Sequence, residues 1–431
     1  MEINWKKNTI LFLGGQCLSL FGSMLVQYAI MWHITLKTES GSMITVFILA
    51  GILPMFFISP FAGVWADRFN RKYIINIADG SIALATLIVA VFFIFGFESH
   101  WLLLGCAAIR ALGQGVQTPA VNAFIPQIVP EQHLTKINGI NGSIQSLTML
   151  LAPMLSGALL SFASIKIIFF LDVFTAIIGI GIVFFFVKVP AAKGNAGAEL
   201  FTENHAAQGE TPSGGKGLEY FHDLKEGIKY VGRHGFILRL IVFSTIFFIA
   251  VSPTAFLTPL HVTRKFGQEA YAAITGIFTK EVWRLTALEI AFSSGMMLGG
   301  LLISVWGGFK NRIYTMALAT ALFGIEAVAL GFLTNFWLYL AVMAIMGMTM
   351  PLYNTPSMVL LQSKIESAYM GRVFGVFGMV SSLMMPAGML IFGPLSDKVS
   401  IDLLLIVTGI VIFLLSIPFI TSKVLREAGR P

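Results

Sequence analysis

Charged residues are scarce in this 431-residue sequence: they make up 11% of it, while apolar residues make up 56%. Ordinary globular proteins carry about 25% charged residues, so too little charge is present here to cover a water-facing surface. A soluble fold is therefore excluded, and so is a disordered chain, which requires low hydrophobicity and high charge. The composition predicts a protein embedded in lipid, whose spans are helices because each must satisfy its own backbone hydrogen bonds.

Several chemical signals are also missing. The two cysteines, Cys17 and Cys106, lie inside apolar stretches, so no disulfide framework is expected. The seven histidines show no metal-ligand spacing, and Gly214-Gly215-Lys216 lacks the other residues of a phosphate-binding loop. No nucleophile and base occur at matched depth. We therefore expect neither an enzyme nor an ATP-driven pump, with no metal, no cofactor and no nucleic-acid partner.

Twelve apolar runs are each long enough to cross about 30 Å of hydrocarbon as a helix. With the N-terminus inside, 20 lysines and arginines fall in cytoplasmic segments and 7 in outer ones. This bias predicts that both termini are cytoplasmic. The expected spans are approximately 9–36, 42–66, 73–96, 101–126, 136–163, 167–187, 236–260, 285–306, 313–333, 336–361, 371–395 and 402–422.

The spans fall into two groups of six, separated by a polar linker. We expect an N-terminal six-helix half at 1–187, a cytoplasmic linker at 188–235 and a C-terminal six-helix half at 236–431. Apolar residues recur at three- and four-residue steps from Leu218 to Val231, which predicts an amphipathic helix in the linker. Two locations are open for this helix: the membrane surface, or the surface of the protein itself.

The two halves also repeat each other in sequence. Asn70 aligns with Asn311, and Pro119 aligns with Pro356 at nearly the same offset. A parallel duplication of six-helix units places a substrate site between the halves, near the bilayer midplane. The predicted fold class is an all-α integral membrane protein with twelve transmembrane helices in two pseudo-symmetric halves.

The segment 63–72, GVWADRFNRK, follows the second span and resembles the most diagnostic motif of the major facilitator superfamily. Within that superfamily, Gly15-Gln16 and the segments 109–120 and 171–173 resemble the macrolide-efflux type of bacterial drug–proton antiporter. The resemblance implies a monomeric transporter of the bacterial inner membrane that exports lipophilic, cationic, macrolide-like compounds by alternating access, driven by the proton-motive force. The alternative is an exporter of a metabolite such as a siderophore, or a lipid flippase, with the same fold.

The resemblance also assigns two motifs. It implies that a cytoplasmic gate, in which an acid ties the halves together near Gly371, is formed by Gly63, Asp67, Arg68, Arg71 and Lys72. The alternative for the three cations is that they only anchor the chain on the cytoplasmic side. On helix 5, Pro153 and Gly157 belong to a degenerate antiporter motif, although small residues on a packing face explain it almost as well.

Five charged residues lie well inside predicted spans, away from the span ends, where a charge at the helix centre costs about 2.5–3.5 kcal/mol. Arg110 and Asp172 fall at comparable depth on neighbouring spans, so we expect them to pair or to share one network. A purely structural pair is the alternative. The other three are Asp79, Glu289 and Glu326.

One arginine cannot neutralise four acids, and burial disfavours the charged form of a carboxyl group. At least one of the four is therefore expected to be protonated near neutrality, and to exchange its proton for a cationic substrate. The order of candidates is Asp172, Glu289, Glu326 and Asp79. Glu326 could instead reach outward to water, and Asp79 could belong to the cytoplasmic gate.

The cavity is expected to be apolar and adaptable, because the chain has 20 methionines and 38 phenylalanines. Most such side chains on membrane helices face lipid or pack together. Lipid-facing amides are unfavourable, so the polar side chains expected to face the cavity are Gln16, Gln27, Gln145 and Asn354.

Overall fold

The computed structural model describes residues 4–189, 216–266, 281–366 and 369–430, which form helices and no strand. The ends of the long helices agree with the predicted spans to within about one helical turn, when the π-helical turn Ile182–Phe186 that continues α6 is counted with it. The N-terminal half consists of α1 (Trp5–Thr38), α2 (Gly41–Arg68), α3 (Arg71–Ile94), α4 (His100–Ile128), α5 (Leu134–Phe162) and α6 (Ile165–Gly181). The C-terminal half consists of α9 (Gly235–Phe256), α10 (Thr258–Phe266), α12 (Glu281–Trp306), α13 (Arg312–Phe332), α14 (Phe336–Lys364), α15 (Met370–Ser396), α16 (Ile401–Thr421) and α17 (Lys423–Ala428).

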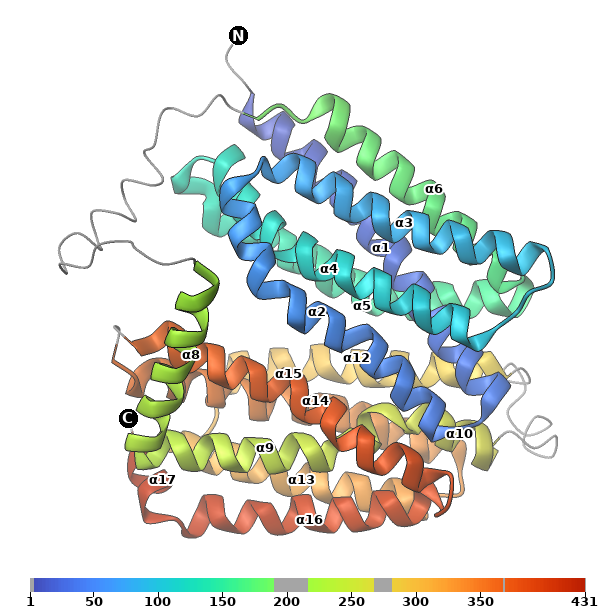
Figure 1. The fold of residues 1–431 in the computed structure, drawn as a ribbon. Coiled ribbons are helices and arrows are strands. Elements are labelled where there is room, and N and C mark those ends of the chain that lie inside the picture. The colour runs from blue at the N-terminus through green and yellow to red at the C-terminus, as the bar shows by residue number, and fades with distance from the viewer. Residues whose placement is uncertain (1–3, 190–215, 267–280, 367–368, 431) are drawn as a thin grey trace, which may run out of the picture.

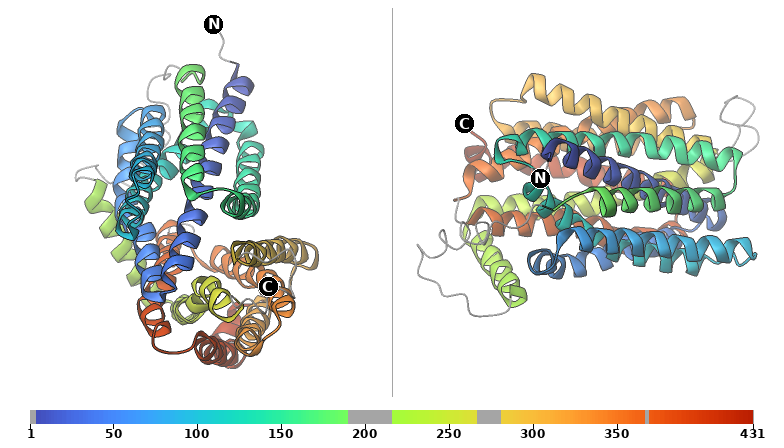
Figure 2. Two further views of the ribbon diagram at one scale, coloured as in Figure 1. Left: turned by 90° about the vertical axis from the view of Figure 1, so that its right-hand side faces the viewer. Right: turned by 90° about the horizontal axis from the view of Figure 1, so that it is seen from above.

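The predicted all-helical membrane fold is confirmed. In the described residues, eleven spans meet the length and hydropathy of a membrane crossing. The remaining long helix, α4, carries Arg110 and several glutamines, and it packs against α2 and α3. Figures 1 and 2 show the two halves as separate bundles lying side by side, with α2 reaching across toward α10 and α15.

The repeat seen in the sequence corresponds to equivalent helix starts. The Asn70 side chain accepts a hydrogen bond from the Lys72 amide at 3.0 Å and so caps the N-terminus of α3. Its counterpart Asn311 accepts from the Ile313 amide at 3.1 Å and caps α13. A side-chain oxygen at this position satisfies one of the free amides of a helix start, which explains why an asparagine occupies both positions.

The two ends of the bundle differ in how the halves meet. We call the end formed by residues 38–41, 256–266 and 396–401 the latch end, and the end that carries both termini the terminal end (Figure 1). At the latch end, Thr45 of α2 donates a hydrogen bond to the Met389 carbonyl of α15 at 3.0 Å. Gly41 and Gly393 allow these two helices to approach closely, because a side chain at either position would collide with the opposite helix.

The linker helix α8 (Lys216–Arg233) packs on the protein at the terminal end, and its described side chains begin at residue 225. Tyr230 is buried and its ring stacks on Tyr369, with centroids 4.4 Å apart. Glu226 forms an ion pair of 2.7 Å with Arg372 of α15. Of the two locations left open by the sequence, the described part of α8 occupies the one against the protein.

Candidate functional site

A cavity of about 320 Å³ lies in the N-terminal half, between α1, α4 and α5, with single residues from α2 and α3. Its lining is more polar than the sequence predicted. Of the four side chains expected there, Gln16 and Gln145 line it, whereas Gln27 and Asn354 do not. Six lining residues carry primary amides: Gln16, Gln114, Gln117, Asn122, Asn141 and Gln145.

The amides missed by the sequence prediction come mainly from α4, as a polar stripe. Gln114, Gln117 and Asn122 are three and five residues apart, with Thr118 between them, so they project from one face of the helix. All four line the cavity. This spacing was visible in the sequence and could have identified α4 as a cavity wall.

Asp79 of α3 lies directly behind this wall. Its side chain is buried, with 2% of the residue exposed. Gln117 donates a hydrogen bond to Oδ1 at 2.6 Å, and Gln16 donates to Oδ2 at 3.2 Å. In the described part of the chain Asp79 has no ion pair, and its side-chain partners are neutral: two amides that line the cavity and the hydroxyl group of Ser19.

Arg110 and Asp172 form a buried ion pair, as their depth predicted. The Nη1–Oδ2 distance is 2.7 Å, and each side chain is 1% exposed. Thr86 donates to the same carboxylate oxygen at 2.9 Å, and the guanidinium also contacts the Thr86 hydroxyl and the Ser23 carbonyl. A fixed counter-ion therefore compensates Asp172, which stood first among the coupling candidates.

The two glutamates lie in the C-terminal half and have no ion pair with a described residue. Glu326 of α13 is buried and accepts a hydrogen bond from Thr349 of α14 at 2.8 Å, while its second oxygen has no partner. Because it is buried in the bundle, it does not reach outward to water. Glu289 of α12 is partly buried and lies within electrostatic range of Tyr28 on α1. Neither glutamate lines the N-terminal cavity.

The helix 5 motif lies at a tight contact between the halves. Gly157 of α5 faces Thr286 of α12 so closely that no side chain would fit at position 157. The residue before it, Ser156, donates a hydrogen bond to the Leu25 carbonyl of α1 at 3.1 Å. Pro153 is buried in the same helix. These contacts support the packing explanation, and an antiport role for the motif stays a prediction.

Two of the three cations of the 63–72 motif, Arg71 and Lys72, bind backbone carbonyls. Arg71 donates to the carbonyls of Ala66 and Ala123, at 2.8 and 3.0 Å, and so joins the end of α2 to α4. Lys72 donates to the carbonyls of Phe184 and Val187, at 2.8 and 2.7 Å. The carbonyls of Ala66, Phe184 and Val187 lie at helix ends, where a positive charge is favourable.

Two other residues of the predicted gate, Gly63 and Arg68, make no comparable contact with a described residue. Gly63 and Arg68 lie in the last turns of α2, where Arg68 is exposed. The side chain of Asp67 lies outside the described structure, so its predicted contact across the halves stays a prediction.

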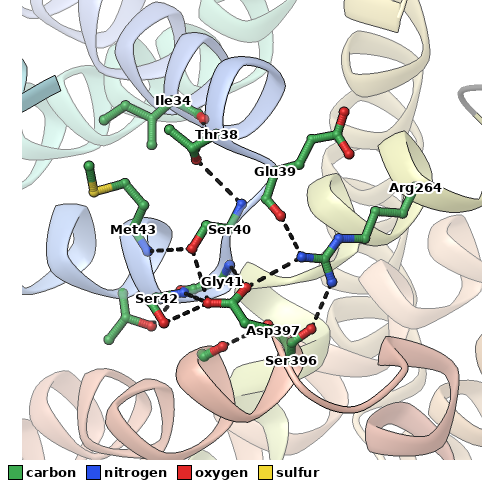
Figure 3. A network of polar contacts seen from close by, with 12 residues as sticks. Ile34, Thr38, Glu39, Ser40, Gly41, Ser42, Met43, Arg264, Ser396 and Asp397 are labelled. Atoms are coloured by element: carbon green, nitrogen blue, oxygen red, sulfur yellow. Dashed lines mark hydrogen bonds and ion pairs between the residues drawn. The ribbon is translucent and has the colours of Figure 1, made fainter. Parts of the chain in front are cut away.

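Sequence reasoning missed a network at the latch end that joins the two halves (Figure 3). Asp397 follows α15, and its carboxylate accepts hydrogen bonds from the N-terminus of α2: from the Gly41 amide at 2.7 Å and from the Ser42 amide at 3.0 Å. The Ser42 hydroxyl donates at 2.6 Å and the Ser40 hydroxyl at 3.0 Å. A carboxylate from one half thus caps a helix of the other half, where the helix dipole favours negative charge.

Arg264 of α10 completes this network, which we call the latch. It forms an ion pair of 3.3 Å with Asp397 and donates to the carbonyls of Ser396 and Glu39. Partial burial opposes ionisation of Asp397, but the hydrogen bonds from Ser42, Gly41 and Ser40 outweigh it and lower the pKa of this carboxyl group. The latch is therefore strongest above the ordinary carboxyl pKa and weakens as pH falls through the lowered value.

Replacing Asp397 with asparagine is expected to open the latch. The variant loses a charged acceptor whose hydrogen bonds are worth about 1.5–3 kcal/mol each. The ratio of molecules with a closed latch to molecules with an open latch should therefore fall about tenfold or more. The measurement is the distance distribution between spin labels placed at the exposed positions Lys37 and Lys398. Glu98→Gln is the matched control, because Glu98 pairs with Lys166 within one half. An unchanged distribution in Asp397→Asn would show that the carboxylate does not hold the halves together.

Comparison with known proteins agrees with this architecture. A family model described as Major Facilitator Superfamily matches residues 12–389. The macrolide efflux protein A of Streptococcus pyogenes is 29% identical over 417 residues, which cover 96% of this chain and 95% of that protein. The protein of the same name from Enterococcus faecalis is 29% identical over 344 residues, covering 79% of this chain and 97% of that protein.

Solved structures agree at the level of the fold. A variant of the nucleoside transporter NupG superposes with a TM-score of 0.70 at 14% sequence identity, covering 96% of this chain and 98% of that one. The family, these relatives and this structural neighbour are all transporters, and the described helices are long and apolar enough to cross a membrane many times. The chain belongs to the Major Facilitator Superfamily and is a multi-pass membrane transporter.

Proposed function

We propose that this transporter exports lipophilic, cationic small molecules, macrolide-like drugs among them, in exchange for protons across the bacterial inner membrane. The relatives named macrolide efflux protein A support the substrate class. The excess of lysine and arginine at the terminal end supports an orientation with both termini in the cytoplasm. In that orientation the latch lies on the outer side of the membrane.

Asp79 is the single observation that carries the proposal. It is a buried carboxyl group without a counter-ion in the described residues, and two of its hydrogen-bond donors, Gln16 and Gln117, line the cavity. A carboxyl group in this position is neutral when protonated and attracts a cation when ionised. Proton and cationic substrate therefore compete for one site, which couples their movements in opposite directions.

The latch supports alternating access to this site. It joins α2 to the segment after α15 with hydrogen bonds between the two halves, and in the proposed orientation such contacts would close the outer side. The amides and hydroxyls involved can form hydrogen bonds with water when the halves separate, so the contact can be broken and formed again. We infer that the structure corresponds to the inward-facing state and that the latch opens in the outward-facing state.

Everted membrane vesicles test the proposal. With an acidic interior, vesicles that contain the protein should accumulate radiolabelled erythromycin, by about tenfold for each pH unit if one proton is exchanged. A protonophore should abolish the accumulation, and removal of ATP should not. Accumulation that needs ATP, or none under a pH gradient, would contradict proton-coupled export.

A further inference from the structure

The chemistry of the N-terminal cavity is unusual for a site that takes a purely lipophilic compound. Six of its fifteen lining residues carry primary amides and three carry hydroxyl groups, while none is aromatic or charged. Small-molecule pockets are ordinarily lined mostly by apolar and aromatic side chains with a few polar groups. This lining therefore matches a ligand that carries many hydrogen-bonding groups of its own.

Most of the amides are free to bind a ligand. Gln114, Asn122, Asn141 and Gln145 make no hydrogen bond through their side chains with any described residue. Each amide offers two N–H donors and a carbonyl acceptor, so the four together suit hydroxyl groups, which both donate and accept. A hydrocarbon in their place would leave these groups unpaired, at a cost for each.

The charged residues near the cavity favour a polyhydroxylated ligand that carries a positive charge over one that carries a negative charge. The cation inside α4, Arg110, is already bound to Asp172, Thr86 and the Ser23 carbonyl. None of the described lining residues carries a positive charge that could bind an anion. Asp79 is buried behind Gln16 and Gln117, so an ammonium group would contact its carboxylate by displacing these two amides.

The size of the cavity sets how much of a substrate it can hold. Its volume of about 320 Å³ lies at the low end of the range of about 300–1,000 Å³ found for small-molecule sites. A polar substituent fits, whereas a bulky drug does not fit as a whole. Met24, Met55 and Met149 also line the cavity and can contact an apolar remainder.

We propose that this cavity is a subsite for the amino-sugar substituent of a glycosylated lipophilic substrate. The free amides bind the sugar hydroxyl groups, Asp79 binds the ammonium group, and the lipophilic body stays outside the amide-lined part. The inference rests on the proposed function, because it assigns part of the substrate to the site that exchanges the proton.

Binding of two probes to the purified full-length protein tests the inference. Erythromycin carries an amino sugar, and erythronolide is its sugar-free aglycone. The wild type should bind erythromycin at least about tenfold more tightly than erythronolide, and Gln114→Leu and Gln145→Leu should each weaken erythromycin binding by about tenfold. Binding of erythronolide should change by less than about twofold, because it makes no sugar contact. Gln127→Leu is the matched control, since Gln127 is an exposed amide of α4 outside the cavity lining.

The outcomes separate the inference from the proposed function. Equal affinity of the wild type for both probes, or equal weakening of both probes in the leucine variants, would overturn the amino-sugar subsite. A third outcome is that binding follows the expected pattern but vesicles that contain the protein do not accumulate erythromycin under a pH gradient. This outcome would support the subsite and contradict proton-coupled export.

Discussion

Export driven by a pH gradient is expected to disappear when Asp79 is replaced by asparagine, while exchange of labelled for unlabelled substrate continues. Asparagine keeps acceptor capacity for Gln117 and Gln16, which donate to the carboxylate at 2.6 and 3.2 Å, but it cannot bind or release a proton. Accumulation of about tenfold per pH unit should therefore fall to the level of passive leak. Both activities are measured in proteoliposomes at saturating substrate, because the variant also loses an electrostatic contact with the cation.

Two further variants make this result specific. Glu326→Gln removes a buried carboxyl group that contacts Thr349 and does not line the cavity, and it should keep gradient-driven accumulation. Glu289→Gln tests the partly buried acid near Tyr28. Retained accumulation in Asp79→Asn, or its loss in Glu289→Gln instead, would assign the coupling proton to another group.

Breaking the Arg110–Asp172 pair is expected to lower the free energy of unfolding, as the main effect of the substitution. The two side chains are 1% exposed and 2.7 Å apart, so Asp172→Asn leaves a buried guanidinium without its counter-ion. Removing one partner of a buried pair costs about 3–5 kcal/mol. The measurement is the free energy of unfolding of the detergent-solubilised protein in denaturant, compared with the wild type.

The double variant Arg110→Gln with Asp172→Asn separates charge from packing. It removes both charges, so it should recover part of the stability that Asp172→Asn loses. Should Asp172→Asn instead unfold like the wild type and lose only gradient-driven transport, Asp172 would be the coupling acid, as its first place among the sequence candidates indicated.

The spans could be predicted from the sequence because lipid imposes both a length and an apolar composition on each helix. The internal repeat was also readable, since Asn70 and Asn311 perform the same capping role in the two halves. Depth along a helix can be counted in the same way, and this placed Arg110 beside Asp172.

Direction around a helix axis could not be predicted as well. Asp172, the first candidate for the coupling acid, is paired with Arg110. Asp79, the last candidate, contacts two amides that line the cavity. Which acid faces a cavity depends on how neighbouring helices rotate and pack, and the apolar pattern of a fully embedded helix constrains that rotation weakly. The polar stripe of α4 was the exception, because its amides recur on one face.

The latch could not be found in the sequence at all. Asp397 and Ser42 are 355 positions apart, and neither belongs to a local pattern that indicates a contact. An acid in a short loop and a serine at a helix start are each common in such places. Their meeting follows from the way α2 crosses to α15, which only the three-dimensional arrangement reveals.

Competition between proton and substrate for Asp79 is measured most directly as proton release on binding. Erythromycin is added to the purified protein in weakly buffered solution near neutral pH, and the released protons are followed with an indicator dye. The wild type should release up to about one proton for each bound cation, and Asp79→Asn should bind erythromycin at saturating concentration without release. Equal release by both proteins, or none by a wild type that binds the compound, would contradict exchange at this carboxylate.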